Sequence, residues 1–194
     1  MINEQLKKFT IVLGSASPRR KELLSDIGLE FSIQTTEKEE GYPAKLQEHE
    51  IAEFLAKQKA KFLSENLSKT DLLITADTIV SFKGELLNKP ENKEQAFNTL
   101  SKLSGNTHKV ITGVCIRNRQ KEIAFSAITL VTFNRLTKKE ISFYINNFNP
   151  FDKAGAYGIQ DWIGKIGIKS IEGSYSNVVG LPTDEVYQQL KLFI

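Results

Sequence analysis

One stretch near the amino terminus combines the residue types that bind phosphate groups. The apolar run 11–13 favours a buried strand, and the small residues after it end that strand. Ser17 is a good N-cap, and Pro18 suits the first position of a helix. A helix start offers free backbone N–H groups and a positive dipole end, to which Arg19 and Arg20 add two permanent charges. The stretch predicts an anion site whose natural ligand is a phosphate chain. The alternative is that the two arginines are simply solvated in the first turn of a helix.

A carboxylate interrupts the apolar strand predicted over residues 72–81. Asp77 follows five residues that favour burial, and burying a carboxylate is costly unless it is paired, hydrogen-bonded or bound to a metal. Asp77 is therefore a candidate general base or ligand of a hard cation. An aspartate that caps a nearby turn explains the pattern equally well. Glu37, at the start of an acidic loop, is a further candidate oxygen ligand.

Three lysines and a glutamine complete the set of candidates. Lys59 lies in a predicted helix, whereas Lys89 and Lys153 lie in loops with proline or glycine, where functional groups concentrate. The amide of Gln160 can donate and accept, which suits it to reading the edge of a base. Each of these residues alone is explained by solvated surface or a simple turn. Together with the anion site and Asp77, they indicate an enzyme acting on a nucleoside triphosphate.

Motifs of two large nucleotide-binding classes are absent. The sequence contains neither Gly-x-x-x-x-Gly-Lys-Ser/Thr nor Gly-x-Gly-x-x-Gly, which disfavours P-loop and Rossmann chemistry.

Length and composition set further bounds. The 194 residues, with 40% hydrophobic and 25% charged residues, suit a soluble globular chain, and we expect a single domain over 1–194. A formal net charge of +3 slightly favours polyanionic ligands but is too small to predict a nucleic-acid partner. The lone Cys115 and two histidines exclude a disulfide and disfavour zinc, so a bound metal should be a hard cation. No run is long enough for a membrane span or a signal-peptide core, so we expect a cytoplasmic protein with no membrane partner.

The elements that must position these residues alternate along the chain. Strands are expected over 30–34, 72–81, 85–87, 108–117, 122–133 and 163–172, in addition to the first one. Helices are expected from Pro18, over 48–66, from Asn92 to Gly105, from Thr137 to Asn146, and from Pro182 to the end. The polar turn 118–120 predicts a hairpin, and the mixture of strands and helices predicts a mixed sheet.

Taken in order, short motifs over nearly the whole chain resemble those of one family. They are Ser15-Ala-Ser-Pro-Arg-Arg20, Lys59-Ala60, Ala76-Asp-Thr-Ile-Val80, Lys89-Pro90, Leu103-Ser-Gly105 with His108, Thr112-Gly-Val114, Asp152-Lys-Ala-Gly-Ala-Tyr-Gly-Ile-Gln160, Ile171-Glu-Gly-Ser174 and Val179-Gly-Leu-Pro182. The series resembles the Maf proteins, which are cytoplasmic nucleoside triphosphate pyrophosphatases related in fold to the inosine triphosphate pyrophosphatases. That resemblance implies an α/β fold in which an elongated mixed β-sheet flanked by helices forms a two-lobed body with a central cleft.

The resemblance also implies an activity and roles for residues. The form that ends in Gln160 is similar to the branch that hydrolyses dTTP and UTP to the monophosphate and pyrophosphate, with Mg²⁺ or Mn²⁺ as cofactor. The implied catalytic residue is Asp77, and Asp77 and Glu37 are the implied metal ligands. Substrate choice is implied for Arg19, Thr78 and Gln160. The implied lining of the triphosphate and metal region is Ser15, Lys59, Lys89 and Lys153. Two positions depart from the family pattern: Asn88 replaces a glycine, and Asp161-Trp162 replaces a glycine-rich continuation beside the predicted base reader.

Other functions stay open on the sequence. The chain could be a non-catalytic nucleotide-sensing or nucleic-acid-binding regulator of cell division, or a pyrophosphatase for purine or modified nucleotides. The resemblance also allows a homodimer, which the residues themselves do not reveal.

Overall fold

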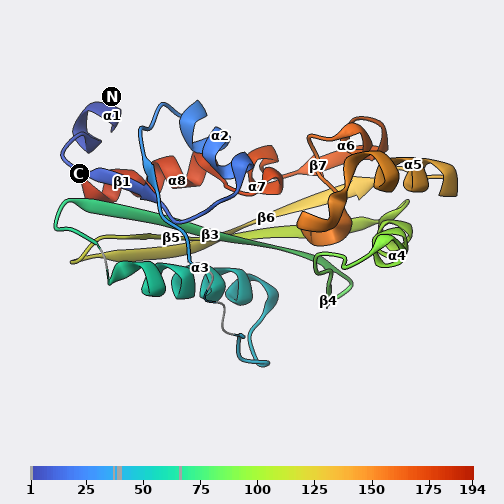
Figure 1. Cartoon of the computed structure of the whole chain (residues 1–194), viewed down its shortest axis with the longest axis horizontal. Coiled ribbons are helices and arrows are strands. Elements are labelled where there is room, and N and C mark those ends of the chain that lie inside the picture. The colour runs from blue at the N-terminus through green and yellow to red at the C-terminus, as the bar shows by residue number, and fades with distance from the viewer. Residues whose placement is uncertain (1, 37, 39–40, 66) are drawn as a thin grey trace. The chain divides into compact units, whose positions relative to one another are not determined.

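The computed structural model describes residues 2–36, 38, 41–65 and 67–194 (Figure 1), so Glu37 lies outside the described residues. The helices are α1 (Ile2–Leu6), α2 (Pro18–Asp26), α3 (Glu48–Ser64), α4 (Lys93–Leu103), α5 (Lys138–Phe148), α6 (Trp162–Gly167), α7 (Tyr175–Val179) and α8 (Thr183–Leu190), with short 3₁₀ helices η1 (Pro150–Asp152), η2 (Ala154–Ala156) and η3 (Lys191–Phe193). The strands are β1 (Thr10–Leu13), β2 (Ser32–Ile33), β3 (Asp71–Phe82), β4 (Glu85–Leu86), β5 (Thr107–Arg117), β6 (Glu122–Phe133) and β7 (Ile168–Glu172).

The strands form a mixed sheet, which confirms the predicted α/β class. Their order is β2-β1-β3-β5-β6-β7, and β4 pairs with β3 outside this path. β1 runs parallel to both β2 and β3, whereas β4 is antiparallel to β3 and β7 is antiparallel to β6. The consecutive strands β5 and β6 are neighbours joined by the turn at 118–121, where Asn118 N–H donates to the Lys121 carbonyl. The predicted hairpin is therefore confirmed.

The chain divides into two compact units. Unit 1 contains residues 1–77, 112–127 and 180–194, and unit 2 contains residues 78–111 and 128–179. Each of the long strands β3, β5 and β6 contributes residues to both units.

Alternation along the strands builds two hydrophobic cores in unit 1. Leu72, Ile74 and Ala76 of β3 join a core that includes residues of α1, α2 and α8. Leu73 points to the opposite face and packs with α3. Within unit 1, α3 therefore covers one face of the strands and α1, α2 and α8 cover the other (Figure 1).

Unit 2 has an aromatic core of its own. The His108 ring lies 5.7 Å from the Phe133 ring and 5.4 Å from the Tyr157 ring, measured between centroids. His108 Nε2 and the Tyr157 hydroxyl are hydrogen-bonded at 2.8 Å. Burial lowers the pKa of His108 to about 4, so this imidazole is neutral near neutral pH.

Two strand predictions were wrong in extent. The segment 163–172 is a strand only from Ile168, because its first half forms α6, whose apolar residues at 162, 163 and 166 follow helical spacing. A Cβ at Gly164 would lie 1.9 Å from the Ile159 carbonyl oxygen, so a glycine is needed where this helix begins against the preceding backbone. The strand expected over 30–34 shrinks to β2, at the edge of the sheet.

None of the helices among the described residues combines the length and the apolar character needed to cross a membrane.

Candidate active site

The loop between β1 and α2 is built as the sequence predicted. Ser17 caps the helix, accepting a hydrogen bond from the Arg20 N–H at 3.4 Å, and Pro18 is the first helical residue. The Ser15 hydroxyl accepts from the Ser17 N–H at 3.2 Å and from Arg20 Nη1 at 3.4 Å. A Cβ at Gly14 would lie 2.5 Å from the Thr75 methyl, so the loop needs a glycine to leave the sheet beside β3.

Arg20 connects this loop to a distant part of unit 1. Its Nε donates to the Gly180 carbonyl at 2.8 Å, across 160 positions of sequence. Burial lowers the pKa of the guanidinium, while the charge of Asp77 acts in the opposite direction. Arg20 therefore lies within electrostatic reach of the predicted catalytic carboxylate, although the sequence assigned substrate choice to its neighbour Arg19.

Asp77 forms an ion pair with Lys59. Lys59 Nζ donates to Asp77 Oδ1, and the two side chains are 22% and 19% exposed. Residues 72–76, which precede Asp77 on β3, are buried, whereas the ion pair itself can be reached by solvent. The Asp77 carboxylate is therefore accessible to a solute.

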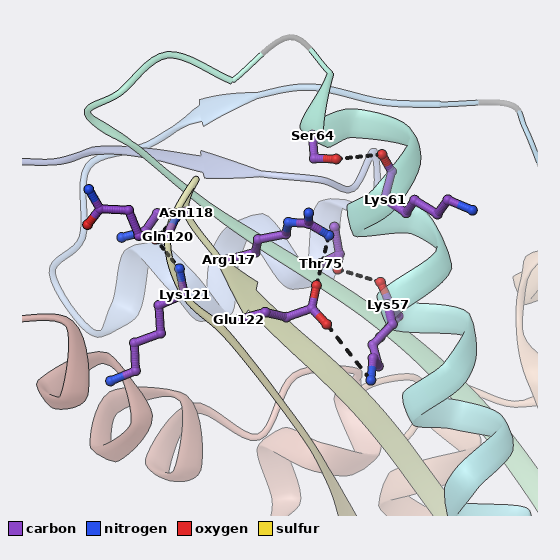
Figure 2. A network of polar contacts seen from close by, with 10 residues as sticks. Lys57, Lys61, Ser64, Thr75, Arg117, Asn118, Gln120, Lys121 and Glu122 are labelled. Atoms are coloured by element: carbon purple, nitrogen blue, oxygen red, sulfur yellow. Dashed lines mark hydrogen bonds and ion pairs between the residues drawn. The ribbon is translucent and has the colours of Figure 1, made fainter.

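The register between α3 and β3 explains this pair. Thr75 and Asp77 lie two positions apart on β3 and so share a face, while Ala56 and Lys59 are one turn apart on α3. The buried Thr75 hydroxyl donates to the Ala56 carbonyl at 2.7 Å (Figure 2). That bond fixes the helix along the strand, and one turn later Lys59 meets Asp77.

Four predicted residues belong to unit 2: Thr78 is half-buried on β3, and Lys89, Lys153 and Gln160 lie in loops. Lys153 is nearly buried, with its side chain 13% exposed, and its Nζ donates to Asp152 Oδ1 at 2.7 Å. Gln160 is half-buried, whereas Lys89 is exposed. The Gly155 N–H donates to the Leu87 carbonyl at 3.0 Å, which ties the segment carrying Lys153 to the one that leads into Lys89.

Among known proteins, the family model for Maf-like proteins matches residues 10–193 of this chain. The chain belongs to the Maf family. Relatives named dTTP/UTP pyrophosphatase include one from Flavobacterium psychrophilum, 46% identical over 98% of this chain and 97% of its own length. A second, from Phocaeicola vulgatus, is 48% identical over 97% of this chain and 98% of its own. A third, from Porphyromonas gingivalis, is 48% identical over 98% of this chain and 97% of its own.

A solved structure also overlaps with the chain. It is a nucleoside-triphosphatase, named dITP/XTP pyrophosphatase, from Mycobacterium abscessus, and it covers 66% of this chain and 76% of its own. The TM-score is 0.40 at 12% sequence identity.

The Maf-family chain offers a metal few ligands of its own. Among the residues with a described position, no group of three His, Cys, Asp or Glu side chains could hold an ion. Mg²⁺ commonly takes one or two carboxylates and completes its shell with substrate phosphates and water. Asp77, with a partly exposed carboxylate, fits such a shared site, whereas Glu37 lies outside the described residues.

A hollow of about 630 Å³ lies elsewhere in unit 1 and was not predicted. Arg117 Nη1 lies 2.8 Å from Glu122 Oε2, and Lys57 Nζ lies 3.8 Å from Glu122 Oε1 at its wall (Figure 2). Its lining contains none of the predicted site residues and consists of Leu46, His49, Glu50, Glu53, Phe54, Lys57, Gln58, Lys61, Arg117 and Glu122. Its three glutamates balance the charges of Lys57, Lys61 and Arg117, so this hollow differs in character from a phosphate site.

Proposed function

We propose that this Maf-family chain hydrolyses dTTP and UTP to the nucleoside monophosphate and pyrophosphate. Relatives that match nearly the full length carry this activity in their names. Within the chain, the observation that carries the proposal is the partly exposed Lys59–Asp77 pair, which lies in the same unit as the Ser15–Arg20 loop. A carboxylate beside permanent cations is the arrangement that hydrolysis of a charged anhydride needs.

In the reaction, water forms a bond to a phosphorus of the α–β anhydride and the bridging P–O bond breaks. The water supplies one proton and one hydroxyl, so that the products are the monophosphate and pyrophosphate. The Asp77 carboxylate, which accepts a hydrogen bond from Lys59 at Oδ1, would accept the proton of that water or ligate a cation. These two roles for Asp77 remain alternatives.

The cationic residues bind the polyphosphate. Arg19, Lys59, Lys89 and Lys153, with the hydroxyl of Ser15, would contact phosphate oxygens and stabilise the charge that develops on the leaving pyrophosphate. A divalent cation, Mg²⁺ or Mn²⁺, held by Asp77 together with phosphate oxygens, would neutralise further charge.

Base selection falls to Gln160, together with Thr78 and Arg19. The Gln160 amide presents one donor and one acceptor, which matches the edge of a uracil or thymine ring.

The decisive experiment is a substrate panel. Purified protein with Mg²⁺ is incubated with pyrimidine, purine and methylated nucleoside triphosphates, and pyrophosphate release is measured for the wild type and for Asp77→Asn. Release mainly from dTTP and UTP, lost in the variant, supports the proposal. Release mainly from purine or modified nucleotides overturns the base assignment, and tight binding without release from any nucleotide favours the sensing role.

A further inference from the structure

The segment 153–161 carries two proposed substrate residues near its ends, Lys153 and Gln160, and a buried tyrosine holds it between them. Tyr144 of α5 is fully buried. Its hydroxyl lies 2.6 Å from Asp161 Oδ2 and 3.0 Å from the Gly158 backbone nitrogen. The amide can only donate, so the phenol accepts from Gly158 and donates its own proton to the carboxylate. One hydroxyl therefore fixes the backbone and a side chain of the same segment.

The Tyr144 hydroxyl stays protonated in this role. Burial raises the pKa of the phenol, and the hydrogen bond to Asp161 raises it further. The Tyr144 hydroxyl can therefore donate its hydrogen bond to Asp161 throughout the usual pH range.

Asp161 does not use its carboxylate as an N-cap usually does. It occupies the N-cap position of α6 without a capping bond from its side chain. Its backbone supplies the turn instead, since its N–H donates to the Gly158 carbonyl at 3.0 Å and its carbonyl accepts from Gly164 at 3.1 Å. The carboxylate is left for Tyr144, and Oδ2 lies 4.0 Å from Lys153 Nζ.

Asp161 adds a second, less exposed negative charge beside Lys153, which also donates to Asp152 Oδ1 at 2.7 Å. The Asp152 side chain is 59% exposed, so water screens its ion pair with Lys153. Asp161 is 24% exposed, and its carboxylate accepts a hydrogen bond from Tyr144. The position of its negative charge relative to Lys153 is therefore fixed.

Gly158 makes this close assembly sterically feasible. A Cβ at position 158 would lie 2.6 Å from Asp161 Oδ2 and 3.0 Å from Lys153 Cε. The carboxylate and the lysine stem therefore pack directly on the Cα of this glycine, and any side chain there would push both away.

We propose that Tyr144 and Asp161 are positioning residues for the nucleotide: their hydrogen bond fixes the Lys153 ammonium group and the backbone that leads to Gln160. This inference rests on the proposed function, because the roles of Lys153 and Gln160 come from it. Neither Tyr144 nor Asp161 contacts the substrate in this proposal. It also gives a reason for the departure from the family pattern at Asp161.

Kinetics of two conservative variants test the proposal in the full chain. Tyr144→Phe removes only a hydroxyl, so both Lys153 and Gln160 lose their support. We expect the KM for dTTP to rise by roughly tenfold and the preference for dTTP over dGTP to shrink by a similar factor. Asp161→Asn keeps an acceptor for Tyr144 but loses the charge facing Lys153. It should raise KM by about as much with the base preference retained.

A double-mutant cycle and a matched control sharpen the test. The cycle consists of Tyr144→Phe, Asp161→Ala and the double variant. Because the two residues share one hydrogen bond, the double variant should lose less than the sum of the two single losses. Tyr187→Phe makes the same change in α8 of unit 1 and should leave KM and base preference unchanged. The proposal would be overturned if the wild type is active and both Tyr144→Phe and Asp161→Asn show a KM and a base preference within twofold of the wild type.

Hydrogen exchange separates this inference from the proposed function. Without nucleotide, Tyr144→Phe should speed exchange of the Gly158 amide by roughly tenfold, because that amide loses its acceptor. If the wild type releases no pyrophosphate, the proposed function fails. Hydrogen exchange at Gly158 then still tests whether Tyr144 anchors this segment. Unchanged exchange at Gly158 would contradict the anchoring whatever the activity.

Discussion

The partial exposure of the Lys59–Asp77 ion pair separates its proposed role in catalysis from its effect on stability. An ion pair that water can reach contributes about 0–1 kcal/mol to folding, because solvent screens it. The same two charges have a large effect on a transition state that gains negative charge nearby. Substitution at this pair should therefore affect turnover far more than unfolding.

Asp77→Asn tests that separation. The amide cannot accept a proton from water and is a poor metal ligand, so kcat for dTTP should fall by roughly 10²–10⁴-fold. The free energy of unfolding should change by less than about 1 kcal/mol, measured by chemical denaturation. Asp71→Asn, the same change at the first residue of β3, is the matched control and should retain kcat. Full activity in Asp77→Asn would contradict the assignment.

The buried His108 makes stability depend on pH in a definite direction. Its pKa is about 4 in the folded protein, because burial disfavours the charged ring, and about 6.5 when unfolded. Between these values the unfolded chain binds more protons, so stability falls as the pH is lowered from 6.5 to 4 and then levels off. The loss attributable to His108 is roughly 1 kcal/mol per pH unit in this window.

His108→Phe should remove that contribution while keeping an aromatic ring beside Phe133 and Tyr157. Urea unfolding at several pH values would show a shallower decline for His108→Phe than for the wild type. The exposed His49 provides the control, since His49→Phe should leave the slope as in the wild type. Equal slopes for wild type and His108→Phe would refute the assignment.

Local sequence patterns were more informative than patterns between distant residues. The Ser17 cap and the strand that contains Asp77 were predicted correctly, because both are signals within a few positions of chain, and the catalytic role of Asp77 stays a prediction. The Arg20–Gly180 and Tyr144–Asp161 contacts were not predicted, since nothing local marks residues that meet across 160 and 17 positions. Tyr144 has helical spacing with apolar neighbours, and this pattern predicts only a core residue.

At the scale of elements, α3 is the part whose placement matters most to the site. In addition to its apolar packing and its ion pairs, two close contacts fix it on the sheet: the Thr75 hydroxyl donates to the Ala56 carbonyl, and Gly113 of β5 touches its backbone. A Cβ at Gly113 would lie 2.1 Å from the Ala52 carbonyl carbon and oxygen and 2.3 Å from the Glu53 nitrogen. Because these are backbone atoms, no side-chain rotation can relieve the clash.

Gly113→Ala should therefore displace α3 from the sheet. We expect a loss of about 3 kcal/mol in the free energy of unfolding, at the upper end for overpacking by one methyl group. Gly41→Ala is the control, because no atom lies within 4 Å of a Cβ there, and its effect should stay within about 0.5 kcal/mol. Denaturant titration of the two variants compares them directly, and equal stability would contradict the close packing of α3 on β5.

The elements themselves were predictable in proportion to their length and caps. The predicted capping box at Thr137 and Glu140 is present at the start of α5, and Gly105 follows α4 with a positive φ of 71°. Segment 163–172 was assigned to a strand because a short apolar run does not distinguish a strand from a buried helix. The short helices α1 and α7 were missed, since five residues are too few for a periodic pattern.

At the scale of the whole molecule, the three long strands bear on how the chain unfolds. Each unit has its own core, yet β3, β5 and β6 contribute residues to both. Breaking a strand in one unit should therefore weaken its continuation in the other. We therefore expect the chain to unfold as the single domain predicted from the sequence, and not as two domains that unfold independently.

The chain carries a natural probe in each unit for testing this. Cys115, buried in unit 1, has a pKa raised to about 12, chiefly by burial, so a thiol reagent should label it only when unit 1 unfolds. Trp162, the single tryptophan, lies 4.9 Å from the Phe143 ring in unit 2, and its fluorescence reports on that unit. Labelling and fluorescence should give one denaturant midpoint, and Gly113→Ala in unit 1 should shift both equally. A shift confined to Cys115 labelling would show two independent domains, because strands that couple the units cannot lose stability on one side alone.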